Sequence, residues 1–258
     1  MKPTRLGSVL LVLSVLAFVS GCASVPLHLS DSSAARLALA PALYGQLIYT
    51  GDVVPRGQAE PAFRYQRFVE ARAAGWVSTH LTRARGAEGV LVLQQATHDD
   101  AYCLTRFEEV HQQTGLTSVV VVNADGSLAF SIERGDRTEQ SSEGTGDPVV
   151  VGPTLFGYVR AHLDELRAGR VLPIRFAVAD RGRSYGFSLR LERAVGRTFV
   201  VMSASDFFVG LAIDPMRIEL DDAGDNILSY RGRVPARRAG LQAFDADVRY
   251  SYAVARFR

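Results

Sequence analysis

Apolar and polar residues alternate over most of the chain after residue 63, which is the pattern of β-strands with one buried face. The clearest strand signal is the run at 118–122, which leads into the turn sequence 123–126 and then into alternation over 128–132. Two such runs around a short turn predict an antiparallel hairpin. Further alternating runs predict strands at 174–178, 187–192, 199–201, 216–220 and 248–254.

One segment has helical periodicity instead. Its apolar residues fall on one stripe, which consists of Leu155, Val159, Leu163 and Leu166. Thr154 is suited to cap the start of a helix, and Gly169 is suited to end it. We therefore expect one main helix at about residues 154–168.

Three other segments are less regular. Residues 33–48 have apolar positions near helical spacing and are predicted to hold a helix, although Pro41 interrupts them. Residues 51–61 and 135–147 are predicted to be loops, and the second is predicted to be mobile because it is polar and contains glycine.

Together these elements predict a mainly β fold, a curved antiparallel sheet or half-barrel that packs one main helix on its apolar face. The chain of 258 residues shows no internal repeat and no linker clear enough to divide it. We therefore expect residues 51–258 to form a single antiparallel β-rich domain.

The first 22 residues have the organisation of a secretory leader. Two basic residues precede an apolar run at 6–19, which is shorter than the ~20 residues of a membrane span. The run ends in Val-Ser-Gly-Cys, which resembles the lipobox of bacterial lipoproteins and places its cysteine at Cys22. The resemblance implies a signal peptide at 1–21 and a lipidated Cys22, which a tether or N-terminal helix follows over 22–50. An uncleaved anchor and a secreted protein with an incidental cysteine are the alternatives.

Lipidation would decide where the protein resides. Several acyl chains on Cys22 would anchor it stably, because each buried methylene contributes ~0.8 kcal/mol. Ala23 stands where an aspartate favours inner-membrane retention in enteric bacteria. The expected location is therefore the cell envelope, on the outer membrane and facing the periplasm.

Charge and cysteine content narrow the range of functions. The sequence has 29 basic and 27 acidic residues, and Lys2 and Arg5 lie in the leader, which leaves 27 of each sign in the mature chain. This balance offers no basic face, so nucleic-acid binding is not expected. With Cys22 lipidated, Cys103 has no disulfide partner, and its apolar surroundings favour a buried core position over a catalytic thiol.

Residues 182–186 have the G-x-S-x-G pattern that exposes a nucleophilic serine in α/β-hydrolases. That site needs a helix after the serine, whereas the alternation after Ser184 predicts a strand. We interpret the segment as a hairpin turn and expect no catalytic residue.

No metal or cofactor is expected either. His98, Asp99 and Asp100 carry suitable ligand atoms, but three adjacent side chains cannot all converge on one ion, so a solvated turn is favoured. The acidic segment 221–226 lacks the spacing of a calcium loop and is interpreted as a strand connection.

The segment 206–215 is dense in apolar residues, which we expect to form core or to line an apolar cavity. The candidate residues are Phe207, Phe208, Leu211 and Ile213.

Residues 153–156, 172–178 and 213–216 resemble segments of a poorly characterised family of exported bacterial proteins, which has no assigned activity to transfer. The expected fold is also similar to that of the periplasmic lipoprotein carriers, which hold acyl chains in an apolar concavity. This likeness implies a non-enzymatic envelope module that binds a lipid or another apolar ligand. An esterase that uses Ser184 and a structural lipoprotein that binds another envelope protein are the alternatives.

Overall fold

The computed structural model describes residues 44–73, 75–206, 210 and 214–254. Several predictions lie outside the described residues: the signal peptide, Cys22, the tether up to residue 43, and the candidates Phe207, Phe208, Leu211 and Ile213.

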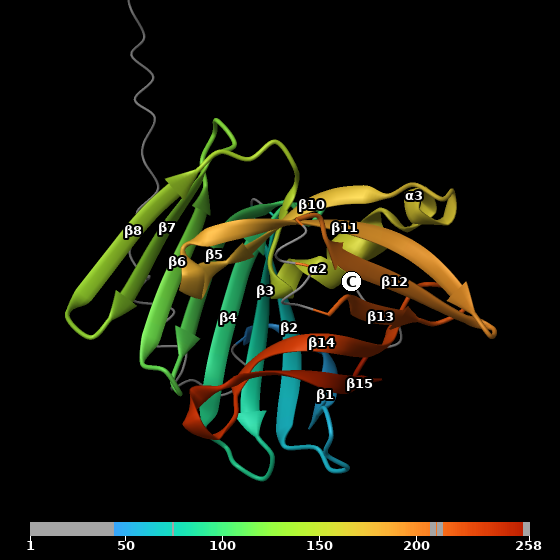
Figure 1. The fold of residues 1–258 in the computed structure, drawn as a ribbon, viewed down its shortest axis with the longest axis horizontal. Helices are drawn as coiled ribbons and strands as arrows, with labels where there is room; N and C mark the ends of the chain where they lie inside the picture. Colours follow the sequence, from blue (N-terminus) through green and yellow to red (C-terminus); the bar gives the residue numbers. More distant parts are fainter. Residues whose placement is uncertain (1–43, 74, 207–209, 211–213, 255–258) are drawn as a thin grey trace, which may run out of the picture.

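One sheet of fifteen strands dominates the described chain (Figure 1). The first half contributes β1 (Gln46–Pro55), β2 (Phe63–Arg72), β3 (Gly75–Ala84), β4 (Val90–His98), β5 (Leu104–His111), β6 (Leu116–Val122), β7 (Leu128–Arg134) and β8 (Arg137–Glu143). The second half contributes β9 (Val149–Val150), β10 (Leu172–Val178), β11 (Arg183–Ala194), β12 (Arg197–Ala204), β13 (Met216–Leu220), β14 (Ile227–Arg237) and β15 (Ala243–Tyr252).

The order of the strands across the sheet follows from two meanders that meet at β1 and β15. It runs β8-β7-β6-β5-β4-β3-β2-β1-β15-β14-β13-β12-β11-β10-β9. Neighbours in this order are antiparallel except β9 and β10, which are parallel. The sheet curves far enough that β11 contacts β8, and the 3₁₀ turn Ala179–Arg181 contacts β6 and β7. The predicted fold class, a mainly β protein with a curved antiparallel sheet, is confirmed.

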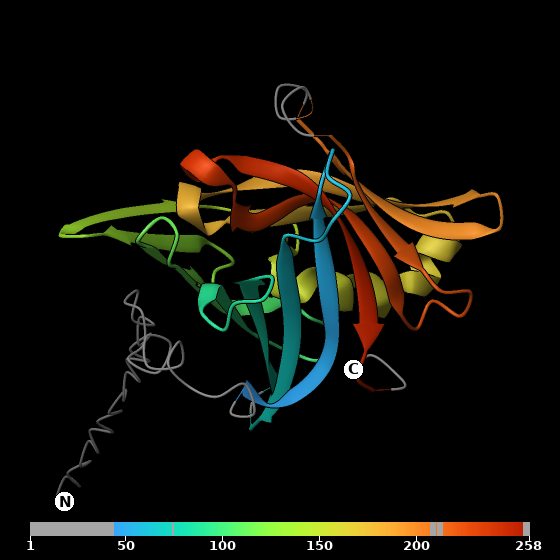
Figure 2. The same ribbon diagram turned by 90° about the horizontal axis from the view of Figure 1, so that it is seen from below.

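Two short helices lie inside the curve of the sheet (Figures 1 and 2). The main helix, α2 (Gly152–Ala161), starts two residues before the predicted Thr154, and α3 (Leu163–Arg167) follows it after a break at His162. Thr154 is not the N-cap. Instead, its hydroxyl accepts a hydrogen bond from the backbone N–H of Val151, the observed N-cap, at 3.0 Å.

The predicted secondary structure is wrong at the end of segment 33–48, in the first half of segment 51–61 and in segment 135–147. Residues 46–48, at the end of the predicted helix 33–48, belong to β1, and β1 also covers the first half of the predicted loop 51–61. Gly51 does not make a turn. It lets β15 approach, because a Cβ there would lie 2.8 Å from Val248. The predicted mobile loop 135–147 contains β8, whose polar side chains are mostly exposed. Such an edge strand pairs through its backbone and therefore shows no apolar alternation.

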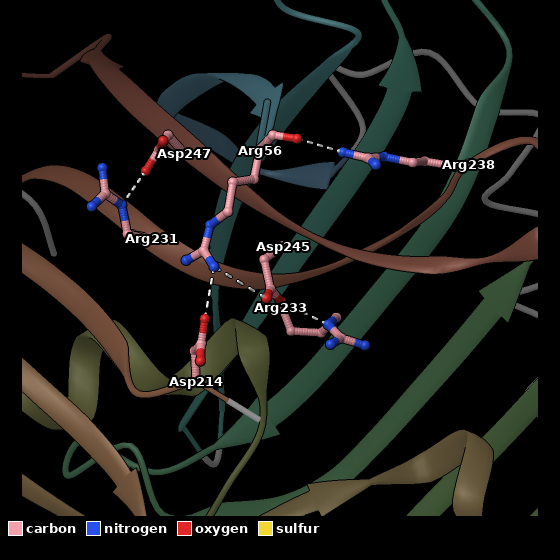
Figure 3. A network of polar contacts seen from close by, with 7 residues as sticks. All are labelled: Arg56, Asp214, Arg231, Arg233, Arg238, Asp245 and Asp247. Carbon is pink, nitrogen blue, oxygen red and sulfur yellow. Dashed lines mark hydrogen bonds and ion pairs between the residues drawn. The ribbon is translucent and has the colours of Figure 1, made fainter. Parts of the chain in front are cut away.

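The outer face of β14 and β15 is charged and solvated. Arg231 lies opposite Asp247 in the register, with Nε 2.5 Å from the carboxylate, and Arg233 lies opposite Asp245 at 2.8 Å. The network drawn in Figure 3 consists of Arg56, Asp214, Arg231, Arg233, Arg238, Asp245 and Asp247. These ion pairs are exposed, so each contributes at most about 1 kcal/mol to stability. The apolar side chains that alternate with them point inward, where the core and the candidate site lie.

In the part of the chain that the structure describes, no helix is both long and apolar enough to cross a bilayer.

Candidate ligand cavity

A cavity of about 450 Å³ lies between the inner face of the sheet and helix α2. This volume falls within the ~300–1,000 Å³ that is common for small-molecule sites. The walls are mainly apolar and come from both halves of the sheet. The apolar lining includes Phe107, Leu155, Phe156, Phe176, Phe187 and Val248.

A β-bulge in β14 shapes one wall of the cavity. The register with β15 shifts between Arg233 and Arg237. Pro235 lies within the shift, where a residue without a backbone N–H is tolerated. A bulge bends its strand and redirects side chains, and here Val234, Pro235 and Ala236 all line the cavity.

Hydrogen bonds fasten this end of β14 to the opposite half of the sheet. His111, at the end of β5, donates from Nε2 to the Pro235 carbonyl at 3.1 Å. The side chain of Gln113 bonds both the backbone N–H and the carbonyl of Arg237, each at 2.9 Å. The Arg237 guanidinium pairs with Asp180 at 2.9 Å. Three segments distant in the sequence are thus joined at one end of the cavity.

A row of polar side chains crosses the mainly apolar inner face. In the register, His80 on β3 lies opposite Gln94 on β4, and Gln94 lies opposite Glu109 on β5. Residues directly opposite one another project from the same face of a sheet, and all three line the cavity. Gln94 Nε2 donates to Glu109 Oε2 at 2.5 Å.

Glu109 has the electrostatic environment of a group that changes charge near neutral pH. Burial raises the pKa of its carboxyl group to about 7, and Asp180 adds to the rise. The hydrogen bond from Gln94 and the positive charge of Arg237 act in the opposite direction but do not cancel it. The cavity therefore holds a carboxyl group that is protonated in mildly acidic solution and ionises only as the pH approaches neutrality.

A fully buried arginine lies beside this row. Arg67 on β2 is 0% exposed and lies opposite His80 in the register. Its Nη1 donates to His80 Nε2 at 2.9 Å and to the carbonyl of Pro153 in the first turn of α2. Its Nη2 donates to Ser78 Oγ at 3.0 Å. Because a buried cation is costly unless it is hydrogen-bonded, these contacts stabilise Arg67 and also hold α2 against the sheet.

His80 stands between Arg67 and the cavity. Burial lowers the pKa of His80 to about 3, so its ring is neutral at physiological pH. Its Nδ1 contacts the hydroxyl group of Tyr65, another cavity residue. The site as a whole therefore combines a large apolar volume with a few polar groups in fixed positions.

The structure places Ser184 within β11, which continues to Ala194, so the helix of a hydrolase elbow does not follow the serine. The predicted hairpin turn at 182–186 is wrong in its position, because the connection between β10 and β11 is the 3₁₀ turn that ends at Gly182. Gly182 has a φ of +61° and so takes the left-handed conformation that this turn needs.

The hydroxyl group of Ser184 is held from two sides. It donates to the carboxylate of Glu143 and accepts from Arg175 Nε at 2.8 Å, while the backbone N–H of Ser184 also donates to Glu143 at 2.7 Å. Glu143 therefore lies within reach as a base, which the sequence did not indicate. The serine is only 5% exposed, and its contacts cross-link β8 to β10 and β11.

His98 is the last residue of β4 and is 2% exposed, so the solvated turn predicted for His98, Asp99 and Asp100 is wrong for His98, whereas the exposed Asp99 and Asp100 follow the strand. Ser78 Oγ donates to His98 Nε2, and His98 Nδ1 donates to the carbonyl of Asp99, both at 2.8 Å. The carboxylate of Asp99 accepts from the backbone N–H groups of Ala101 and Cys103, at 2.9 and 2.8 Å. Over the described residues, no group of three or more His, Cys, Asp or Glu side chains is arranged to hold a metal ion. Cys103 is partly exposed rather than buried as predicted.

The residues that carry the cavity were not singled out from the sequence. His80 and His111 have no metal-ligand spacing in the sequence, and no sequence motif includes Glu109. A signal was present in β5, where Phe107, Glu109 and His111 alternate and all line the cavity. Alternation alone could not show that this face, rather than the opposite one, points inward.

Comparisons with known proteins show no family for this chain. The chain matches no known family and no curated protein. A solved structure of a β-barrel-like protein of a domain of unknown function, DUF1849, from Brucella abortus is 11% identical, covers 81% of this chain and 97% of its own, and has a TM-score of 0.49. An N-terminal dehydratase from the difficidin assembly line is 8% identical, covers 86% of this chain and 82% of its own, and has a TM-score of 0.15. Likeness at this level carries no conclusion about function.

Proposed function

We propose that this protein is a membrane-anchored envelope lipoprotein that binds an apolar ligand, such as a lipid, without catalysing a reaction on it. The observation that carries the proposal is the cavity of about 450 Å³ between the sheet and α2. The apolar side chains that line it face a volume that a packed core would fill with carbon contacts. A ligand with many carbon atoms would supply those contacts. The anchoring part of the proposal is supported by the lipobox at Cys22.

Filling the cavity is expected to abolish ligand binding. In Leu155→Trp the indole ring would project from α2 into the space that a ligand occupies. Native mass spectrometry of protein purified from an envelope fraction should show a bound molecule on the wild type and at least tenfold less of it on Leu155→Trp. Val171→Trp is a matched control, because Val171 is 58% exposed and is not part of the cavity lining. Equal occupancy of wild type and Leu155→Trp would rule out this cavity as the site.

Replacing Cys22 by serine is expected to leave the protein without lipid and to release it from membranes, because serine has no thiol to form the thioether. Fractionation of cells into soluble and membrane material would measure the change, and mass spectrometry of the N-terminal peptide would show whether acyl chains are present. If the Cys22→Ser variant sediments with membranes as the wild type does, the anchor lies elsewhere.

The esterase alternative has one observation in its favour, the carboxylate of Glu143 on the Ser184 hydroxyl. Against it, Arg175 donates to the same oxygen and stabilises its electron pairs, which weakens it as a nucleophile. We expect Ser184→Ala to leave ligand occupancy unchanged and to lower the free energy of unfolding by about 1–2 kcal/mol, since it leaves Glu143 and Arg175 short of a partner. Turnover of acyl esters by the wild type that disappears in a folded Ser184→Ala variant would establish the esterase instead.

A structural lipoprotein that binds another envelope protein is the remaining alternative. It predicts that the purified protein retains a protein partner and an empty cavity, and the same mass spectrum distinguishes it.

A further inference from the structure

The chemistry of the side chains fixes the direction of the hydrogen bonds that join Arg67, His80 and Tyr65. A guanidinium group only donates, so His80 Nε2, 2.9 Å from Arg67 Nη1, must accept. A neutral imidazole carries one N–H group, and in His80 that group is therefore on Nδ1. Since Nδ1 contacts the Tyr65 hydroxyl, His80 donates and the Tyr65 oxygen accepts.

The Tyr65 proton is consequently left to donate elsewhere. The contact with His80 uses the oxygen of the hydroxyl group and not its hydrogen. Tyr65 belongs to the cavity lining, as His80 does. The three groups form a chain in which each bond polarises the next, and it begins at a permanent positive charge. The chain ends in an O–H group that can donate to a molecule in the cavity.

We propose that the cavity binds the carboxylate end of a long-chain acyl ligand, with the Tyr65 hydroxyl as the donor to a carboxylate oxygen. This rests on the proposed function, binding of an apolar ligand, and adds the chemistry of the ligand's polar end. An acceptor of hydrogen bonds completes the chain, whereas an ammonium group, which only donates, would oppose it. The positive charge of Arg67, one residue further along the chain of bonds, favours an anion over a neutral acceptor.

Two carboxyl groups, those of Glu109 and Asp180, line the cavity, and both are compatible with an anionic ligand because Asp180 is paired with Arg237. Glu109 lies at the other end of the polar row from Arg67, with His80 and Gln94 between them in the register. Its carboxyl group stays protonated up to about pH 7, so below that pH it adds no negative charge. The alkyl chain would lie against the phenyl rings of Phe156, Phe176 and Phe187.

A matched pair of variants tests the proposal. Tyr65→Phe removes the donor, whereas Tyr230→Phe removes a hydroxyl group that lines the same cavity but already donates to the Arg233 carbonyl at 2.8 Å. Both variants of the full-length protein would be titrated in detergent with hexadecanoic acid, its methyl ester, hexadecanol and hexadecylamine, and occupancy would be counted by native mass spectrometry. We expect hexadecanoic acid to bind best to the wild type. Tyr65→Phe should weaken its binding by about tenfold or more, the effect of losing a hydrogen bond to a charged group, and Tyr230→Phe should weaken it by less than twofold.

The other possible results separate failure of the carboxylate assignment from failure of the proposed function. Tightest binding of hexadecylamine, or equal losses in the two variants, would overturn the carboxylate assignment while the apolar function stands. Equal binding of the acid and its methyl ester would also overturn it, because the anion would then contribute nothing. If none of the four molecules binds to the wild type, the proposed function itself fails.

Discussion

Replacement of Arg67 by methionine is expected to lower the free energy of unfolding by about 3 kcal/mol. Methionine keeps most of the aliphatic volume of arginine and removes its guanidinium group. Three acceptors then lose their donor: Ser78 Oγ, His80 Nε2 and the Pro153 carbonyl. Each lost hydrogen bond to a charged group lowers the free energy of unfolding by about 1.5–3 kcal/mol. The variant also avoids the desolvation of a buried cation, which offsets part of this loss.

Arg64→Met is the control for this experiment. Arg64 lies on the same strand but is exposed, so the substitution should change stability by less than about 0.5 kcal/mol. Urea denaturation of the three proteins at one pH would measure the difference. A stability of Arg67→Met equal to or above that of the wild type would show that desolvation outweighs the hydrogen bonds. The role of Arg67 in fastening α2 to the sheet would then be refuted.

Replacement of Glu109 by glutamine is expected to stabilise the protein by about 3 kcal/mol above neutral pH and to have little effect near pH 4.5. The ordinary pKa of the carboxyl group is 4.5, and in the folded protein it is raised to about 7. Between these values the folded state binds more protons than the unfolded chain does. The contribution of Glu109 is therefore fully present below pH 4.5 and is lost as the pH rises through about 7. Glutamine keeps an acceptor for Gln94 and never ionises.

The wild type alone would not reveal this effect clearly. His80 acts in the opposite sense, because its pKa is lowered from 6.5 to about 3 and its contribution is lost as the pH falls between these values. Both proteins contain His80, so the difference between Glu109→Gln and the wild type isolates Glu109. Denaturation at pH 4.5 and pH 8.5 would measure it, with the exposed Glu139→Gln as control. A difference that is independent of pH would mean that Glu109 ionises normally in the folded state.

The sequence by itself determined the fold class, the main helical segment and about half of the strands. Alternation over 128–132, 187–192 and 216–220 identified β7, β11 and β13, because a strand with one buried face repeats every second residue regardless of what covers it. The helical stripe located α2 and α3 for the corresponding reason. Strands β2 to β5, β9 and β14 were not located individually, and two further strands were predicted as other structure. β8 is polar on both faces, and in β1 a glycine that serves close strand packing resembled a loop signal.

Only the tertiary structure decided the site. The polar row of His80, Gln94 and Glu109, with Arg67 beside it, exists because four strands pair in one register. No local pattern encodes that register. Arg67 meets Pro153 across 86 positions of the chain, and His111 meets Pro235 across 124. Nothing in the sequence distinguished Glu109 from the other charged residues of the chain. In the folded protein the face of β5 that carries Glu109 lines the cavity. Burial there raises the pKa of the Glu109 carboxyl group to about 7.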